Sequence, residues 1–325
     1  MVRLRKGDNV LIMKAKKEII TQKTFGQRIR RDWSMNWTLY VLMIPVLIYF
    51  ILFCYLPMYG IVMSFQDYSI YKGFSGSEWV GFEHFIKFFQ SPRFGELLFN
   101  TIRISLACLC FGFPAPVVLA LLLNELKSAK LGKVIQNCTY IPHFVSLVVA
   151  CSIVKLFTDE TGVIGSLFNV ITGSTGNMLN EAKNFLPIYV ISNIWQECGW
   201  GSIIYLAALT GIDQSLYEAA EVDGAGKWRK VISITLPSIL PTIIIMLIMR
   251  MGTILSVGYE KILLLGNDGT KEVSSVLSTY NYEVGIKQSR YSYSAAIGLF
   301  NTLVNLAFVQ TSNWISRKVN GYALW

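Results

Sequence analysis

Six long apolar stretches, separated by shorter polar ones, dominate the pattern of the chain. They cover residues 39–63, 97–123, 135–157, 185–209, 237–264 and 293–315. A helix needs about 20 apolar residues to cross the hydrocarbon core of a bilayer, which is about 30 Å thick. The pattern therefore predicts an all-α integral membrane protein with about six transmembrane helices. We expect Pro114 and Pro116 to break the second span, and Pro142 to lie near the start of the third.

The polar segments predict how the chain is oriented. Ten of the 29 Lys and Arg residues lie in residues 1–37, ahead of the first span. Counting from a cytoplasmic N-terminus, 18 Lys and Arg fall in the inner segments (1–37, 124–134, 210–236, 316–325) and seven in the outer segments (64–96, 158–184, 265–292). Because cytoplasmic loops are enriched in these cations, both termini are expected in the cytoplasm.

Two regions follow from this topology. We expect a basic cytoplasmic N-terminal segment at residues 1–37, too long for a cleavable signal peptide, that lies on anionic lipid headgroups. A transmembrane domain at residues 38–325 follows it. The outer loop at residues 64–96 is expected to hold a short amphipathic helix at residues 82–89.

Composition agrees with the membrane prediction. Hydrophobic residues make up 53% of the 325 residues, charged residues make up 15%, and the mean hydropathy is +0.46. A soluble domain carries about 25% charged residues. A net charge of +9 could suit nucleic acid, but the cations gather beside the spans. Nucleic-acid binding is therefore not expected.

The chain shows no pattern typical of a catalyst or a metal site. Its six cysteines have no metal or redox spacing, its two histidines are His84 and His143, and no Ser-His-Asp set is apparent. The phosphate-binding pattern G-x-x-x-x-G-K-[ST] does not occur. We expect no catalytic residues, no metal and no cofactor in this chain, so any energy source would be a separate subunit.

The segment between the fourth and fifth spans is patterned more strongly than a simple loop. Ser215 followed by Glu218 is a capping-box pattern, so a helix should start there. Ala219 and Ala220 give this helix a flat face. Gly224 and Gly226 are expected to end it in a sharp elbow.

The pattern then resumes as a second helix. Its apolar stripe is formed by Trp228, Val231 and Ile232, and Pro237 and Pro241 fit near the start of the next span. The segment could dock on a partner protein or rest on lipid headgroups, and composition alone leaves both open.

The same residues carry a resemblance to a known family. Glu218-Ala219-Ala220, Gly224 and Ile234-Thr235-Leu236-Pro237 resemble, with the same spacing, the EAA motif of permease subunits of binding-protein-dependent ABC importers. Further likeness to the carbohydrate-uptake branch, of the maltose type, lies in Asn100-Thr101, Tyr140-Ile141-Pro142 and Trp195 to Trp200. The stretch from Asn313 to Lys318 resembles permeases for polysaccharide-derived oligosaccharides.

The resemblance implies a fold and partners. It implies the type I ABC importer permease fold, in the cytoplasmic (inner) membrane of a bacterium. A second homologous permease, two ATPase subunits that bind ATP and Mg, and an extracytoplasmic solute-binding protein would complete the importer. The segment at residues 213–236 would be the coupling helix, with ATPase contacts at Glu218, Ala219, Ala220, Asp223 and Gly224.

Candidates for the substrate path come from polar and aromatic residues inside the spans. Ionisable residues at membrane depth are costly and mark function by default. The candidates are Trp195, Gln196, Glu197, Trp200, Tyr205 and Arg250. For each of them, helix packing is an equal alternative. We interpret Arg103, Lys155, Glu260 and Lys261 as residues near span ends that snorkel to the interface.

The sequence therefore indicates a permease subunit for oligosaccharides. The positive charge of Arg250 would suit acidic oligosaccharides that contain uronate units. Two alternatives stay open: an importer permease for another solute such as a polyamine, phosphate or a peptide, and a non-transport membrane protein such as a receptor or enzyme.

Overall fold

The computed structural model describes residues 25–325, and the chain separates into two compact units, residues 1–60 and 61–325. In the first unit, helix α2 (Phe25–Tyr49) continues through the π-helical turn η1 (Phe50–Tyr55) into α3 (Leu56–Met58). Helix α2 kinks at Asn36, whose amide donates to the Asp32 carboxylate at 2.7 Å. Residues 1–24 of the predicted basic segment 1–37 lie outside the described residues, so its contact with lipid stays a prediction.

The remaining elements are helices and one two-stranded hairpin. In chain order they are η2 (Tyr59–Phe65), β1 (Gln66–Asp67), α4 (Gly73–Gly76), β2 (Glu78–Trp79), α5 (Glu83–Phe89), α6 (Phe94–Ala107), η3 (Cys108–Gly112), α7 (Pro114–Asn124), α8 (Ala129–Phe144), α9 (Leu147–Thr158), α10 (Val163–Thr172), η4 (Met178–Asn180), α11 (Ala182–Thr210), α12 (Gln214–Val222), α13 (Lys227–Lys230), η5 (Val231–Thr235), α14 (Leu236–Met251), α15 (Tyr259–Leu265), η6 (Asp268–Thr270), α16 (Lys271–Ser274), α17 (Leu277–Tyr282), η7 (Glu283–Lys287) and α18 (Tyr291–Asn320). Strands β1 and β2 pair antiparallel, with Gln66 opposite Trp79. Helix α5 confirms the helix predicted at residues 82–89.

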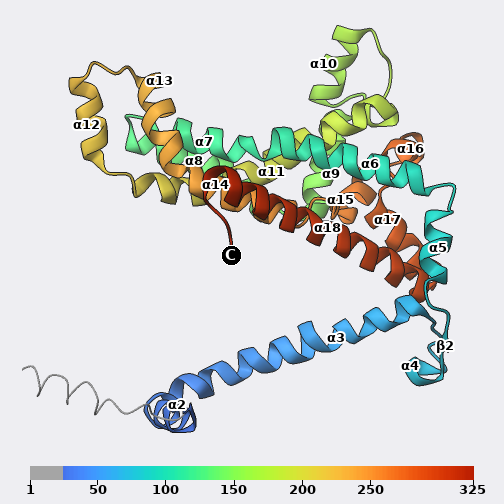
Figure 1. Cartoon of the computed structure of the whole chain (residues 1–325). Coiled ribbons are helices and arrows are strands. Elements are labelled where there is room, and N and C mark those ends of the chain that lie inside the picture. The colour runs from blue at the N-terminus through green and yellow to red at the C-terminus, as the bar shows by residue number, and fades with distance from the viewer. Residues whose placement is uncertain (1–24) are drawn as a thin grey trace, which may run out of the picture. The chain divides into compact units, whose positions relative to one another are not determined.

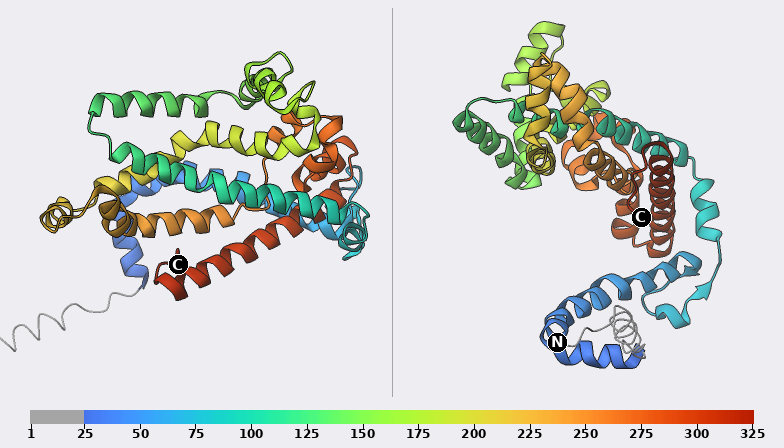
Figure 2. Two further views of the ribbon diagram at one scale, coloured as in Figure 1. Left: turned by 90° about the horizontal axis from the view of Figure 1, so that it is seen from above. Right: turned by 60° about the vertical axis from the view of Figure 1, so that its left-hand side comes forward.

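In the second unit the long helices α6–α7, α11, α14 and α18 run side by side (Figures 1 and 2). Helices α12 and α13 project from one end of this group, and α15, α16 and α17 lie at the opposite end. The C-terminal end of α18 lies at the end that carries α12. The segments at 210–236 and 265–292 therefore lie at opposite ends of the helices, as the charge pattern predicts.

Several helices of the described chain are long and apolar enough to cross a membrane. Four qualify, at Asp32–Phe65, Phe94–Asn124, Lys227–Met251 and Tyr291–Val319, and a bent pair between residues 129 and 172 could form a fifth. Helix α11 has 29 residues but carries Asn193, Gln196 and Glu197 near its middle, which makes it less apolar. The protein is an all-α membrane protein, as predicted, and the count of six spans stays a prediction.

Proline does not break the second span, contrary to our expectation. Phe94–Asn124 is one helical stretch that includes Pro114 and Pro116. The turn before Pro114 is π-helical, and so is the turn before Pro237. Proline lacks an N–H and its ring clashes with the carbonyl of the preceding turn. A π turn provides extra room at that carbonyl, so the helix continues past the proline.

The third predicted span is wrong in shape. The region predicted as one span at residues 135–157 is divided between two helices, α8 and α9, and the stretch Leu147–Thr172 that α9 begins is bent by 106° from α8. The break falls after Pro142, where Val145 is extended and Ser146 caps the new helix by accepting the N–H of Val149. A side-chain cap of this kind satisfies a free N–H of the helix start.

The fifth predicted span, residues 237–264, is shorter than expected because its helix ends at Met251. Residues 252–258 then form a non-helical connection to α15. Polar side chains satisfy the backbone there. Ser105 donates to the Ile254 carbonyl, Asn305 accepts the Leu255 N–H at 3.0 Å, and Ser278 donates to the Val257 carbonyl at 2.7 Å. Irregular backbone at membrane depth is tolerated where protein covers it or where it lines a cavity.

Helix α11 is packed closely between its neighbours because it carries glycine at two crossings. A Cβ at Gly199 would lie 2.0 Å from the Thr139 carbonyl oxygen of α8, and a Cβ at Gly201 would lie 3.1 Å from Pro116 of α7. Small residues allow helices in membranes to approach closely. These contacts position the polar middle of α11 against α7 and α8.

Candidate functional site

Helix α12 projects from the unit, and none of its residues is buried. Its N-cap is Asp213, whose carboxylate accepts the N–H of Ser215 at 3.0 Å. The predicted cap at Ser215 is therefore wrong by two positions, because the helix starts earlier and Ser215 is one of its first residues, with its own N–H bonded to Asp213. Accepting the backbone and side-chain hydrogen bonds of Ser215 lowers the pKa of Asp213.

The helix ends in a tight turn at Gly224. This residue has φ +72°, while the N–H of Gly224 bonds to the Glu221 carbonyl and that of Ala225 to the Ala220 carbonyl. The two bonds form a Schellman motif, which needs a left-handed residue that is usually glycine. The predicted elbow is thus formed by Gly224. Gly226 has φ −68° and instead precedes α13.

Two side-chain contacts join α12 to the returning helix. The Tyr217 hydroxyl lies 2.9 Å from the Thr235 hydroxyl, and the Lys230 ammonium lies 2.6 Å from the Glu221 carboxylate. The hydrogen bond from Lys230 lowers the pKa of Glu221. The segment is therefore a braced helical hairpin that leaves Glu218 and Ala219 exposed.

The hairpin also exposes large apolar side chains. Val222 is 89% exposed, Trp228 77% and Ile232 63%. An exposed apolar patch on a rigid projection marks a surface that another molecule covers.

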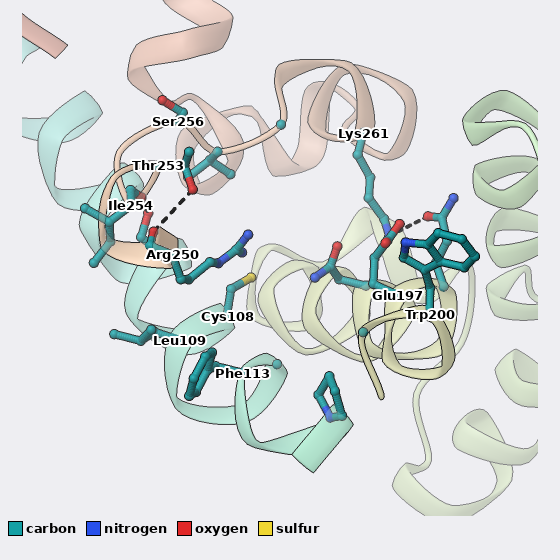
Figure 3. Close-up of a pocket in the computed structure, with 18 of the residues that line it drawn as sticks. Cys108, Leu109, Phe113, Glu197, Trp200, Arg250, Thr253, Ile254, Ser256 and Lys261 are labelled. Carbon is teal, nitrogen blue, oxygen red and sulfur yellow. Dashed lines mark hydrogen bonds between the residues drawn. The ribbon is translucent and has the colours of Figure 1, made fainter. Parts of the chain in front are cut away.

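A cavity of about 840 Å³ lies between α6–α7, α11, α14 and the connection to α15 (Figure 3). Of the candidates for the substrate path, Gln196, Glu197, Trp200, Tyr205 and Arg250 line it. Trp195 is not among its lining residues. The helical spacing of α11 explains the difference, because residues three or four apart share one face and Trp195 points to another.

Sequence analysis missed several residues of this cavity. Asn193 and Tyr189 of α11 line it, and so do residues 253, 254 and 256–258 of the non-helical connection. The signal for Asn193 was present, because it lies one helical turn before Gln196 and Glu197. No sequence pattern marks the connection, since the end of α14 depends on contacts from distant helices.

Lys261 lines the cavity as well, and our interpretation of it as a snorkelling residue is wrong. It is only 6% exposed. Its ammonium donates to the Gln196 side-chain oxygen at 3.3 Å and lies 5.8 Å from the centre of the Tyr189 ring. Lys261 sits on the short helix α15, whose fold back onto α9 and α11 could not be predicted from its apolar surroundings.

The charged side chains of the cavity differ in whether they have a partner of opposite charge. Arg250 and Lys261 have no ion-pair partner among residues 25–325. In contrast, the Glu197 carboxylate lies 3.0 Å from Nδ1 of His143. Figure 3 shows Arg250 pointing into the cavity from the end of α14. Both cations thus lack a carboxylate within ion-pair distance, and of the two carboxylates that line the cavity, Glu197 contacts His143 while Glu260 has no ion-pair partner among the described residues.

Aromatic rings outside the lining support Trp200, which lines the cavity. The His143 ring stacks on Trp200 with centroids 4.7 Å apart and planes at 2°, and Phe144 meets Trp200 edge to face. Ring faces beside hydrogen-bonding groups are the usual composition of a small-molecule site. Among the described residues, no group of three or more His, Cys, Asp or Glu side chains is placed to hold a metal ion.

A membrane bundle with a polar central cavity and a projecting helical hairpin defines a transport permease rather than an enzyme. The chain belongs to the family of binding-protein-dependent transport system inner membrane components, whose model matches residues 112–321. The resemblance carried by the EAA motif is thereby confirmed. The protein is a permease subunit of an ABC importer, and ATP hydrolysis belongs to a separate subunit of such importers.

Curated relatives cover most of the chain. It is 46% identical to Protein LplB of Bacillus subtilis (strain 168) over 288 residues, which are 88% of this chain and 91% of that protein. It is 42% identical to the polygalacturonan/rhamnogalacturonan transport system permease protein YteP of the same organism, over 96% of this chain and 94% of the relative.

Solved structures agree. A chain of a bacterial ABC transporter involved in the import of the acidic polysaccharide alginate has a TM-score of 0.82 and 40% identity, covering 90% of this chain and 99% of the other. A second structure of a bacterial alginate transporter, in complex with an alginate pentasaccharide-bound periplasmic protein, has a TM-score of 0.83 at 40% identity. The type I importer fold is therefore confirmed.

Proposed function

We propose that this permease imports oligosaccharides that contain uronate units, and that the cavity of about 840 Å³ is its part of the translocation path. The observation that carries the proposal is the pair of cations, Arg250 and Lys261, that line the cavity without carboxylate partners in the described chain. Arg250 is exposed, whereas Lys261 is buried, and a buried charge without a carboxylate partner is costly, so the retention of Lys261 fits a ligand that supplies the opposite charge. The names of YteP and of the alginate transporter, which refer to acidic polysaccharides, support the same class of substrate.

The aromatic rings suit the rest of such a substrate. A sugar ring offers C–H faces that pack on aromatic rings and hydroxyl groups that bond to polar side chains. Trp200 and Tyr205 supply the rings, and Asn193 and Gln196 supply hydrogen-bonding groups. Among the alternative solutes, a cationic polyamine fits worst, because Arg250 and Lys261 would repel it.

The projecting hairpin is proposed to be the coupling element. Glu218, Ala219, Ala220, Asp223 and Gly224 would contact one ATPase subunit, which binds ATP and Mg. The exposed Ala219 lets a partner surface approach closely, and the braces at Tyr217 and Glu221 allow the hairpin to transmit force as one body. Closure of the ATPase pair would then turn the cavity from one side of the membrane to the other.

The remaining partners complete the proposed importer. They are a second homologous permease, a second ATPase subunit and an extracytoplasmic binding protein, assembled in the cytoplasmic (inner) membrane of a bacterium. The complex of the alginate transporter with its periplasmic protein supports the last of these partners.

The test is a saccharide screen on the assembled importer. The chain would be co-purified with its partner permease, ATPase and binding protein and reconstituted in vesicles. We expect ATPase activity to be stimulated by galacturonate or alginate oligosaccharides more than by neutral oligosaccharides of equal length. Equal stimulation by both kinds would refute the acidic substrate, and stimulation by neither would refute oligosaccharide import.

A further inference from the structure

A second cavity, of about 460 Å³, lies beside the first at the end of the unit that carries α17 and η7. Both cavities are lined by residues 256–259. The opposite wall of the second cavity comes from α17, η7 and α18, which contribute Asn281, Tyr282 and Asn301. The two cavities therefore share a wall and lie in series.

The shared wall is held in place by side chains of α17 and α18. Ser278 donates to the Val257 carbonyl at 2.7 Å, and the Asn305 amide donates to the Ser256 hydroxyl at 3.1 Å. Because the non-helical segment is tied to α17 and α18, the wall is part of the fold rather than a free loop. A molecule that extends beyond the first cavity at this wall enters the second.

The second cavity has a different chemistry from the first. None of its lining residues is charged, whereas Arg250 and Lys261 line the first. Its polar groups are hydroxyls and amides. The Ser294 hydroxyl donates to the Asn281 side-chain oxygen at 2.7 Å. The side-chain oxygen of Asn301 is buried and accepts no hydrogen bond from the described residues.

Asn301 lines the second cavity, but its unsatisfied side-chain oxygen is turned into the protein and is closed to water. A buried acceptor without a partner is costly, so turning the amide of Asn301 toward the cavity, where a hydroxyl group of a ligand could donate to its oxygen, would be favourable. Gly298 lies one helical turn before Asn301 on α18, and a Cβ there would lie 3.8 Å from the Asn281 amide nitrogen. A methyl group would therefore fit at Gly298, whereas a larger side chain would extend into the space beside the two amides.

An aromatic pair stands at the boundary between the cavities. Tyr259 lines both of them and stacks on Tyr282 with ring centroids 5.4 Å apart and planes at 24°. Tyr259 is 37% exposed, so part of its ring remains available. A ring that borders both cavities could contact two consecutive units of one saccharide chain.

We propose that the second cavity is a second saccharide subsite, which binds the next unit of the oligosaccharide through its hydroxyl groups rather than through a carboxylate. This inference rests on the proposed function, because the first cavity must hold the preceding unit. The ligand of the second cavity is a hydroxyl-bearing sugar ring, and Asn301 turns its amide toward the cavity to accept a hydrogen bond from one of the hydroxyl groups. The permease therefore distinguishes long chains from short ones at this point.

The test compares substrate length in the complete importer reconstituted in vesicles with its own binding protein. Uptake of digalacturonate and pentagalacturonate would be measured for the unchanged chain, for Asn301→Leu and for Gly298→Leu. The first variant removes the acceptor and the second fills the cavity. Gln310→Leu, an amide exchange at an exposed position of α18 outside both cavities, is the matched control.

We expect both cavity variants to raise the KM for the pentamer about tenfold, corresponding to ~1.4 kcal/mol, and to leave the KM for the dimer within twofold of the unchanged chain. Equal losses for dimer and pentamer, or no loss for either, would overturn the subsite while leaving the proposed function in place. If the unchanged importer transports neither of the two galacturonate oligomers and neither the dimer nor the pentamer of alginate, the proposed function itself fails and the subsite fails with it.

Discussion

Nδ1 of His143 lies 3.0 Å from the Glu197 carboxylate, and the same imidazole stacks on Trp200 at 4.7 Å. His143 comes from the last turn of α8, whereas Glu197 and Trp200 lie on α11. The contact draws a carboxylate of the cavity toward α8 and keeps Trp200 in a defined orientation. The charge that a substrate meets in the cavity therefore depends on a residue outside its lining.

The first prediction follows from this pair. His143→Ala should leave Glu197 free to face the cavity and to repel acidic substrates. We expect the KM for uronate oligosaccharides to rise about tenfold, which is typical of a lost hydrogen bond to a charged group. The double variant His143→Ala/Glu197→Gln should recover most of the loss. Uptake assays on the four proteins form a double-mutant cycle, and additive effects would show that the two residues act independently.

Lys261 gives the second prediction. Lys261→Met keeps the length of the side chain and removes its charge, so uptake of acidic oligosaccharides should fall at least about tenfold. Uptake of any neutral saccharide that the importer accepts should change much less. Lys155→Met, at an exposed lysine outside the cavity, is the control. A uniform loss for charged and neutral substrates would mean that Lys261 only supports the fold.

The third prediction concerns the turn of the projecting hairpin. Gly224 has φ +72°, and a Cβ added there would meet no atom within 4 Å. A substitution is therefore opposed by backbone strain alone, about 1–2 kcal/mol for an ordinary residue. Gly224→Val should impair ATP-driven uptake while the chain still inserts in the membrane, whereas Gly224→Asn should be tolerated better, because asparagine adopts this conformation more readily. Gly226→Ala, at φ −68°, is the matched control. Full uptake with Gly224→Val would exclude the coupling role proposed for the hairpin.

The fourth prediction tests helix packing. A Cβ at Gly199 would lie 2.0 Å from the Thr139 carbonyl oxygen, a distance that needs movement of the backbone. Gly199→Ala should cost about 1–3 kcal/mol or more, as overpacking does. The thermal stability of the purified complex should fall clearly. Gly132→Ala, in α8 with nothing near its Cβ position, should leave that stability unchanged.

The fifth prediction is a pH dependence of the hairpin. The pKa values of Asp213 and Glu221 are lowered by the hydrogen bonds that they accept from Ser215 and Lys230. Stability from a carboxylate with a lowered pKa is present above its ordinary pKa and is lost as the pH falls through the lowered value. The protection of the α12 amides, taken relative to the intrinsic exchange rate at each pH, should therefore be constant from pH 7 to about pH 5 and decrease below about pH 4. Asp213→Asn, which retains a capping oxygen, should weaken this dependence, and unchanged acid sensitivity in it would argue against the cap.

Several features of this protein follow from the amino-acid sequence alone. Long apolar runs must be buried in lipid or protein, so the all-α membrane class follows from their length. The spacing from Glu218 to Pro237 identifies the permease family, because a short motif lies within one local hairpin. The elbow at Gly224 was predictable for the same reason, since glycine is preferred where a helix ends in a left-handed residue.

Other features depend on contacts between distant helices and emerge only from the folded chain. The cap at Asp213 rather than Ser215 is a choice between two nearby polar residues that the pattern does not separate. The end of α14 at Met251, the burial of Lys261 against Gln196 and the position of Trp195 outside the cavity depend on which helices meet there. Local patterns record the preference of a segment for helix and for lipid, but the free energy of a buried charge or a broken helix is set by the groups that the fold places around it.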